Sequence, residues 1–239
     1  MKILYVIPAR AGSNGVPGKN YKPLNNKPLI EYSIDFALSN MVAGDELCVS
    51  TNDADVVKIL NKKGIILPFI RPEELSTDTA GSYEVLLHSL RHYKDQGKEF
   101  DALLLLQPTS PFRAKEDFDK VMSAYDDDCD MVVTVKLCKD SPYFNLFEEN
   151  REGYLQKSKD GDFVNRQSAP AVYAYNGSIY LIRISSLLQS RLNEFRKIKK
   201  VVMPAERSID IDTPEDWYLA EYLSKSDPNK ANEREGGLI

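Results

Sequence analysis

The chain opens with ILYVIPARAGSNGVPGKN (residues 3–20), an apolar run that leads directly into a loop rich in glycine. The run Ile3–Ile7 predicts a buried strand, and the loop that follows carries the cations Arg10 and Lys19. Glycines let backbone N–H groups approach a ligand closely, and two cations balance the charge of a polyphosphate. We therefore interpret this loop as a site for a nucleoside triphosphate. An ordinary surface turn after a first strand is the alternative.

The loop differs from the two most familiar phosphate-binding motifs. A Walker A loop requires Gly-x-x-x-x-Gly-Lys followed by Ser or Thr, whereas Gly18-Lys19 is followed here by Asn20. The spacing Gly-x-Gly-x-x-Gly is also absent, so a dinucleotide site is not expected.

The rest of the chain alternates between strand and helix patterns. Further apolar, strand-like runs occupy residues 46–50, 103–106, 131–135, 178–184 and 201–203. Helical spacing of apolar residues marks the segments between them, and Thr213 followed by Pro214 is typical of the start of a last helix. This alternation predicts an α/β domain with a mostly parallel sheet, in which ligands bind at the carboxyl ends of the strands. The first loop lies at such an end.

Composition limits the classes of function. The 239 residues suffice for one large domain or two small ones, and the net charge of −5 argues against general nucleic-acid binding. No apolar run reaches the length of a membrane span, and the N-terminus lacks a signal-peptide pattern. Three cysteines, Cys48, Cys129 and Cys138, are typical of reduced thiols. We therefore expect a cytoplasmic protein without a membrane partner.

The strand and helix rhythm breaks in residues 139–175, which are polar but interleaved with aromatics. Tyr143, Phe144 and Phe147 are examples. Aromatic residues on a polar excursion suggest packing against a second subunit, and a plain lid or loop is the alternative. We expect one domain over residues 1–223 that contains this excursion, followed by a flexible tail over 224–239.

A pair of carboxylates precedes the last helix. Asp210 and Asp212 lie two residues apart, so in an extended segment both project from one face. Such carboxylates repel each other unless a cation lies between them, and Mg²⁺ with phosphate oxygens is a suitable cation. The alternative is that one aspartate merely caps the helix, but Thr213 already provides that cap.

Other polar loops are weaker candidates. Gln107 follows the most apolar strand and can donate and accept hydrogen bonds, as a polyol substrate requires. The guanidinium of Arg166 could pair with a substrate carboxylate, although taken alone a surface salt bridge is the favoured interpretation. His88 and His92 have the spacing of zinc ligands without an evident third ligand, and we interpret them as helix-surface residues.

Taken together and in this order, these segments resemble the CMP-sialic acid synthetase family, the cytidylyltransferases that activate nine-carbon 2-keto sugar acids. The resemblance covers residues 3 to 223. It rests on Ile7-Pro8-Ala9-Arg10, Gly12-Ser13, Lys19-Asn20, Arg71-Pro72, Leu75-Ser76-Thr77-Asp78-Thr79-Ala80, Leu105-Leu106-Gln107-Pro108-Thr109-Ser110-Pro111, Arg113, Arg166-Gln167, Asn176-Gly177, Ile179-Tyr180 and Ser208-Ile209-Asp210-Ile211-Asp212-Thr213.

The resemblance implies a Rossmann-like fold with helices on both faces of the sheet, and a homodimer formed through the excursion. It implies that CTP and a keto sugar acid of the sialic acid type give the CMP-sugar and pyrophosphate. The implied roles are Arg10, Ser13 and Lys19 at the triphosphate, Asn20 at the ribose, Arg71, Ala80 and Ser82 at cytosine, Gln107, Arg166, Asn176 and Tyr180 at the sugar, and Asp210 and Asp212 at Mg²⁺. Arg10, Lys19 and the two aspartates are the implied catalytic group.

The chain departs from the family pattern at three positions. Asn14 stands where members usually carry lysine, Phe144 stands near a lysine position of sialate-specific members, and Tyr175 replaces a common proline. The acceptor could therefore be legionaminate, pseudaminate or the deaminated sialic acid, with the same chemistry. A nucleotide-binding module without catalysis is a more remote alternative, and the intact aspartate pair argues against it.

Overall fold

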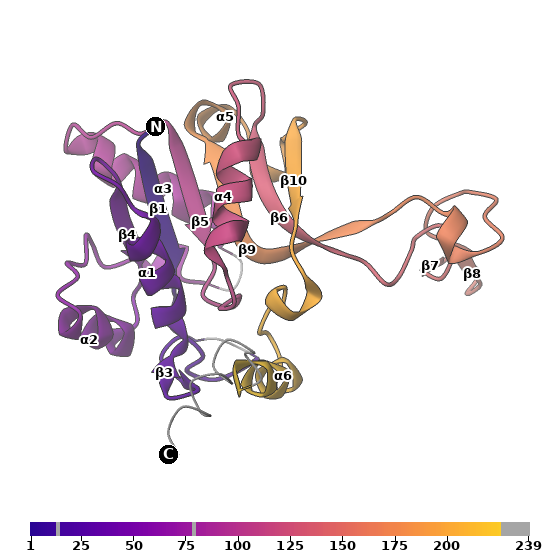
Figure 1. Cartoon of the computed structure of the whole chain (residues 1–239), viewed down its shortest axis with the longest axis horizontal. Helices are drawn as coiled ribbons and strands as arrows, with labels where there is room; N and C mark the ends of the chain where they lie inside the picture. Colours follow the sequence, from indigo (N-terminus) through magenta and orange to yellow (C-terminus); the bar gives the residue numbers. More distant parts are fainter. Residues whose placement is uncertain (13–14, 78–79, 226–239) are drawn as a thin grey trace, which may run out of the picture.

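A six-stranded sheet forms the centre of the molecule (Figure 1). The computed structural model describes residues 1–12, 15–77 and 80–225. The strand order is β10-β6-β9-β5-β1-β4, and only β9 among these six runs antiparallel to its neighbours. The bounds are β1 (Ile3–Pro8), β4 (Glu46–Ser50), β5 (Ala102–Leu106), β6 (Met131–Leu137), β9 (Tyr173–Arg183) and β10 (Ile198–Val202). The predicted α/β class with a mostly parallel sheet is confirmed.

Helices cover both faces of this sheet, as expected for strands that are apolar throughout. One face packs against α1 (Leu29–Asn40), α2 (Ala54–Lys62) and α4 (Lys115–Ala124). The other face packs against α3 (Ser82–Asp95) and α5 (Ile184–Gln189). Within β1, Tyr5 belongs to the first apolar cluster and Val6 to the second, because successive side chains of a strand point to opposite faces.

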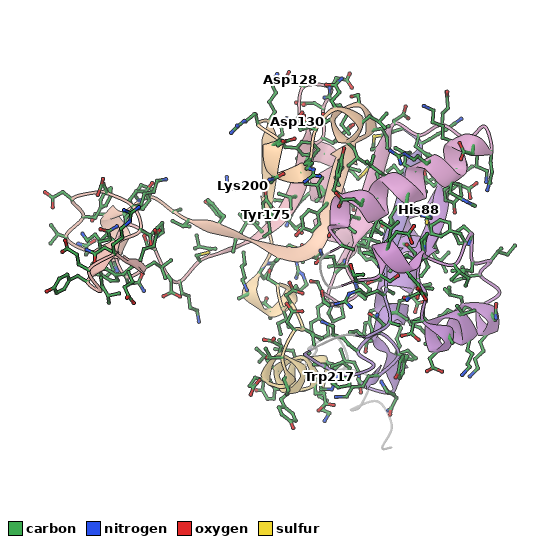
Figure 2. The ribbon with its side chains drawn as sticks, turned by 180° about the vertical axis from the view of Figure 1, so that it is seen from behind. His88, Asp128, Asp130, Tyr175, Lys200 and Trp217 are labelled. Carbon is green, nitrogen blue, oxygen red and sulfur yellow. The ribbon has the colours of Figure 1, made fainter. Side chains whose placement is uncertain are left out.

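A third apolar cluster lies outside the sheet, where α6 (Pro214–Lys225) packs near the short strands β2 (Pro23–Leu24) and β3 (Lys27–Pro28). It buries Val16 of the first loop together with Ile209, Ile211 and Trp217. The side chain of Trp217 marks this region in Figure 2. The cluster therefore fixes the first loop beside the segment that carries Asp210 and Asp212.

The excursion projects from the body of the molecule as a separate lobe (Figure 1). It contains the hairpin of β7 (Phe147–Glu149) and β8 (Leu155–Lys157) and the short helix η2 (Arg166–Ser168). β9 begins at Tyr173, five residues before the predicted start at Ser178, because its first residues pair with the end of β6 as the chain returns to the body. Tyr175 lies on this connecting stretch in Figure 2.

β9 also contains an irregularity that the sequence did not indicate. Tyr175 pairs with Val135 and Tyr180 pairs with Val133, so residues 176–179 all lie opposite Thr134. The Thr134 hydroxyl holds this bulge by donating to the Asn176 side-chain oxygen at 2.8 Å and accepting from the Ile179 N–H at 2.9 Å. Bulges of this kind redirect side chains beside functional sites.

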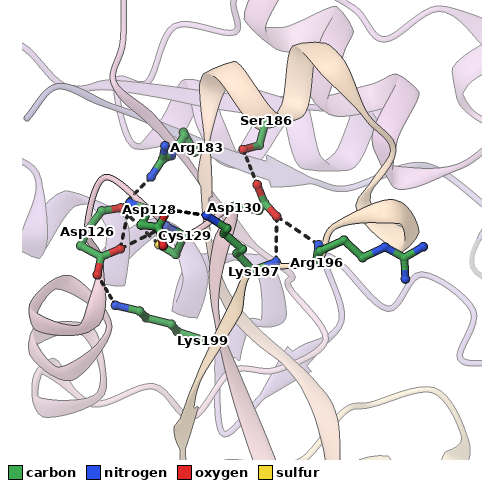
Figure 3. A network of polar contacts seen from close by, with 9 residues as sticks. All are labelled: Asp126, Asp128, Cys129, Asp130, Arg183, Ser186, Arg196, Lys197 and Lys199. Atoms are coloured by element: carbon green, nitrogen blue, oxygen red, sulfur yellow. Dashed lines mark hydrogen bonds and ion pairs between the residues drawn. The ribbon is translucent and has the colours of Figure 1, made fainter.

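A polar network lies at the end of the sheet where β6 and β10 begin (Figure 3). Asp130 accepts from the Ser186 hydroxyl and from the backbone N–H groups of Arg196 and Lys197, at 2.8 to 3.0 Å. Lys197 and Lys199 pair with Asp128 and Asp126. These basic residues therefore serve local ion pairs at the strand ends.

The remaining short helices are η1 (Glu73–Leu75), η3 (Leu192–Glu194) and η4 (Ala205–Arg207). α6 begins at Pro214 as predicted and reaches Lys225, two residues beyond the expected end of the domain at 223. The rest of the expected tail, residues 226–239, lies outside the described part of the chain. None of the described helices is both long and apolar enough to cross a membrane.

Candidate active site

A cleft of about 430 Å³ lies at the carboxyl ends of the central strands. Nine of the predicted site residues line it, although they come from five separate segments of the chain. They are Arg10, Lys19, Asn20, Arg71, Ala80, Ser82, Gln107, Asp210 and Asp212. The position agrees with the expectation that an open α/β sheet binds its ligand at this edge.

Lys19 and Asn20 hold the first loop in place as well as lining the cleft. The Lys19 ammonium is largely buried and donates to the Ile211 carbonyl at 2.7 Å and to Asp212 Oδ1 at 3.0 Å. The Asn20 amide donates to the Arg10 carbonyl at 3.0 Å. Gly15 is required here, because a Cβ at this position would lie 1.7 Å from the Asp212 carbonyl oxygen.

Asp210 is the deeper of the two carboxylates. Its Oδ1 is buried and has no hydrogen-bond partner among the described residues. Burial raises the pKa of the Asp210 carboxyl above its ordinary value; a hydrogen bond from the Thr109 side chain to the carboxyl opposes this effect, and the charge of nearby Asp212 adds to it. A buried oxygen without a partner beside a second carboxylate is suited to a hard divalent cation. No group of three acidic, histidine or cysteine residues with metal-site geometry occurs in the described ranges.

Arg71 forms the opposite wall of the cleft with Ala80 and Ser82. Its side chain is 4% exposed and donates to the Ser50 hydroxyl and carbonyl at the end of β4. Burial lowers the pKa of this guanidinium to about 10, so it remains charged near neutral pH. Ser82 begins α3, so this wall is fixed between a strand end and a helix start.

The third wall follows β5 and includes Gln107 and Thr109. The Ile211 N–H donates to the Thr109 carbonyl at 2.9 Å, which ties this loop to the segment with the aspartate pair. Gly177 has a φ of +71°, and a Cβ there would lie 2.9 Å from Gln107 Oε1 and 3.0 Å from Asp210 Oδ2. Only glycine fits both this conformation and this contact.

Two predicted sugar-side residues lie behind the cleft instead of lining it. The Asn176 side chain is fully buried, and its amide donates to the Ser208 hydroxyl at 3.0 Å while its oxygen accepts from Thr134. Tyr180 packs edge-on against Tyr175, and burial raises the pKa of its phenol to about 12. The structure therefore gives Asn176 a supporting position, with its polar atoms used within the protein.

The remaining residues considered in the sequence analysis lie outside the cleft lining or outside the described residues. Ser13 and Asn14 lie outside the described residues, and of Arg166 only the placement in η2, within the excursion, is described. His88 and His92 pack on the ring of Phe69 and are half-buried, with Nδ1 of His88 buried, so the predicted surface position is only partly met. Figure 2 shows His88 on α3. The sequence assigned no role to Thr109 or Gly15. Both lie in loops that had been identified as ligand loops, Gly15 in the first glycine-rich loop and Thr109 in the loop after Leu106.

A family model described as "Cytidylyltransferase" matches residues 4–226. The chain belongs to the cytidylyltransferase family. This match confirms the resemblance seen in the sequence and identifies the protein as a nucleotidyltransferase. The nucleotide expected in the cleft is therefore CTP.

Curated relatives support the same assignment. The chain is 33% identical to the CMP-N,N'-diacetyllegionaminic acid synthase of Legionella pneumophila, over 93% of this chain and 96% of that protein. It is 33% identical to an N-acylneuraminate cytidylyltransferase of Streptococcus agalactiae, over 99% of this chain and 58% of that protein. It is 27% identical to the pseudaminic acid cytidylyltransferase of Campylobacter jejuni, over 94% of this chain and 97% of that protein.

A solved structure confirms the fold. CMP:2-keto-3-deoxy-manno-octonic acid synthetase, in complex with CTP, superposes with a TM-score of 0.68 at 20% sequence identity, covering 95% of this chain and 100% of that one. At this identity the likeness supports the Rossmann-like nucleotidyltransferase fold.

Proposed function

We propose that this protein transfers CMP from CTP to the anomeric hydroxyl of a nine-carbon 2-keto sugar acid. The observation that carries the proposal is the single cleft in which buried Arg71, the Lys19 loop and the aspartate pair meet. The names of the relatives give the acceptor class, which includes legionaminic, pseudaminic and acylneuraminic acids.

In this reaction the hydroxyl oxygen of the sugar forms a bond to the α-phosphorus and loses its proton to water. The bond between the α-phosphorus and the oxygen that bridges it to the β-phosphate breaks, and pyrophosphate leaves. Lys19 and Arg10 neutralise charge on the triphosphate, while Gln107 orients the acceptor. Catalysis of this kind comes mainly from positioning and from electrostatic stabilisation of developing charge. The buried wall that contains Arg71 holds the cytosine base of CTP.

Asp210 and Asp212 would hold Mg²⁺, and their geometry fits this ion because the buried Oδ1 of Asp210 has no hydrogen-bond partner within the described part of the chain. When bound there, the ion supplies Lewis-acid stabilisation to phosphate oxygens. The Lys19 ammonium holds Asp212 from the side of the first loop, which fixes that carboxylate in position.

A homodimer formed through the excursion is part of this proposal. Phe147 is 47% exposed and Leu155 is 70% exposed on the projecting hairpin. Apolar side chains on a thin lobe are stabilised when a second copy covers them. Tyr143 instead packs on Phe163 inside the lobe, with ring centroids 5.4 Å apart. The second subunit of the dimer would then cover the acceptor side of the cleft.

The cytosol is the proposed compartment, because the buried residues Cys48 and Cys129 carry free thiols, as is usual in a reducing environment.

The decisive test is pyrophosphate release from CTP with a panel of N-acetylneuraminate, N,N'-diacetyllegionaminate, pseudaminate and the deaminated sialic acid. We expect turnover with one of these acids and little with UTP or ATP. Absence of turnover with every member of the panel, by protein that binds CTP, would contradict the proposal.

A further inference from the structure

Arg113 lies behind Gln107 and outside the lining of the cleft, yet it contacts three segments that meet there. Its Nε donates to the Ser178 carbonyl at 3.0 Å, and its Nη1 donates to the Ser33 hydroxyl at 2.9 Å. Its Nη2 donates to the Gln107 carbonyl at 2.5 Å. One guanidinium therefore joins β9, α1 and the end of β5.

These contacts begin where the sheet ladder stops. Leu106 and Ile179 form the last residue pair of the ladder between β5 and β9. The carbonyls of the next residues, Gln107 and Ser178, both accept from Arg113. The guanidinium thus sets the spacing of the two strands just beyond the ladder, at the level of the cleft.

The neighbouring groups leave little freedom for that spacing to change. Gly177 precedes Ser178 and lies against Gln107 Oε1 and Asp210 Oδ2, with no room for a Cβ. A shift of Ser178 by a few tenths of an ångström would move Gly177 and with it the space beside both side chains. The Ser110 hydroxyl donates to the Asn176 carbonyl at 2.9 Å and links the same two segments.

The chemistry of the site suits arginine and no other cation. A guanidinium carries five N–H donors in a rigid planar fork, whereas an ammonium is a compact point charge. Burial lowers the pKa of Arg113 to about 9, and the nearby charge of Asp210 partly offsets this effect. The Phe36 ring lies 5.8 Å from Cζ and covers one side of the group.

We propose that Arg113 is a positioning residue for the acceptor half of the cleft, which it fixes by holding the carbonyls of Gln107 and Ser178. The proposal rests on the proposed function for the identity of the acceptor. It predicts that the acceptor side depends on Arg113 while the cytosine side, held by Arg71 and α3, does not.

The test compares two arginine-to-lysine variants of the full chain. R113K keeps the charge and loses the fork. R183K is the matched control, because Arg183 lies at the other end of β9 and also donates to a backbone carbonyl, that of Asp126, at 2.9 Å. The assay measures KM for the acceptor that the wild-type protein uses, Kd for CTP with Mg²⁺ by calorimetry, and the melting temperature. Hydrogen exchange is followed over residues 103–110 and 174–180.

For R113K we expect the acceptor KM to rise on the order of tenfold, with the Kd for CTP within about twofold of wild type. Hydrogen exchange should increase in residues 103–110 and 174–180. R183K should change neither the acceptor KM nor the exchange of these two segments. An unchanged acceptor KM, or equal weakening of CTP and acceptor, would overturn the proposal. If the wild-type protein uses no acid of the panel, the proposed function fails, and hydrogen exchange still decides whether Arg113 fixes these segments.

Discussion

Lys19 and Asp212 form an ion pair within the lining of the cleft, with 3.0 Å between Nζ and Oδ1, although 193 positions separate them in the sequence. Each charge balances the other before any ligand is present. A triphosphate accompanied by a cation offers new partners to both, so binding can exchange this pair for two others without leaving a charge unpaired. The cleft is therefore prepared for a ligand that brings both signs of charge.

Replacing Lys19 or Arg10 by alanine should reduce kcat/KM for CTP by at least about a hundredfold, because negative charge develops on the leaving pyrophosphate. Circular dichroism should remain native-like. K62A, at an exposed lysine of α2, is the matched control and should behave as wild type. Near-normal rates in both K19A and R10A would show that the phosphates bind elsewhere.

The variant D212N keeps the shape of the side chain and removes its charge. We expect turnover to fall by more than about a hundredfold, because the proposed Mg²⁺ site loses an anionic ligand. The nearby exposed acid Glu215 provides the control E215Q, which should retain activity. Unchanged activity of D212N at saturating Mg²⁺ would remove Asp212 from the metal site.

Asp210 should lower the stability of the fold near neutral pH. Its pKa in the folded protein is raised by burial, so the folded state binds more protons than the unfolded state between the two pKa values. Stability is lost as the pH rises through this window. D210N should therefore melt at a higher temperature than wild type at pH 8 while losing activity, and the difference should vanish at low pH. Equal melting temperatures at pH 8 would contradict this reasoning.

The variants G15A and G97A compare a glycine that the cleft requires with a glycine that affects only the stability of the fold. G15A would place a Cβ 1.7 Å from the Asp212 carbonyl, so the first loop must move away from the aspartate segment and activity should fall. Gly97 has a φ of +76°, and a Cβ added there would meet no neighbouring heavy atom within 4 Å, so G97A should cost about 1 kcal/mol in stability and leave kcat unchanged. Retained activity in G15A would show that the loop can shift without consequence.

The exposed hairpin of the excursion should decide the oligomeric state. The double variant F147D/L155D places charges on the proposed interface, and sedimentation should then show a monomer that binds CTP and no longer transfers CMP. V42D/L188D alters two exposed apolar residues elsewhere and should remain a dimer. A wild-type protein that is monomeric at micromolar concentration and fully active would exclude this part of the proposal.

Local patterns in the sequence were enough to predict the sheet and the ends of several elements. Strands such as Ala102–Leu106 are apolar throughout because both faces are buried. The Thr213–Pro214 pair begins α6, where the Thr213 hydroxyl accepts from the Asp216 N–H at 3.3 Å. Strand periodicity and helix capping depend on residues a few positions apart, so the sequence alone contains the information.

The sequence also determined the family, because motifs such as Leu105–Pro111 and Ser208–Thr213 occur in the expected order. What it did not contain is the arrangement of side chains between distant segments. The bulge that buries Asn176 opposite Thr134, the Lys19–Asp212 pair and the contacts of Arg113 all join residues from different elements. They arise only when the packed sheet brings strand ends together. The tertiary structure therefore decided which predicted residues line the cleft and which support it from behind.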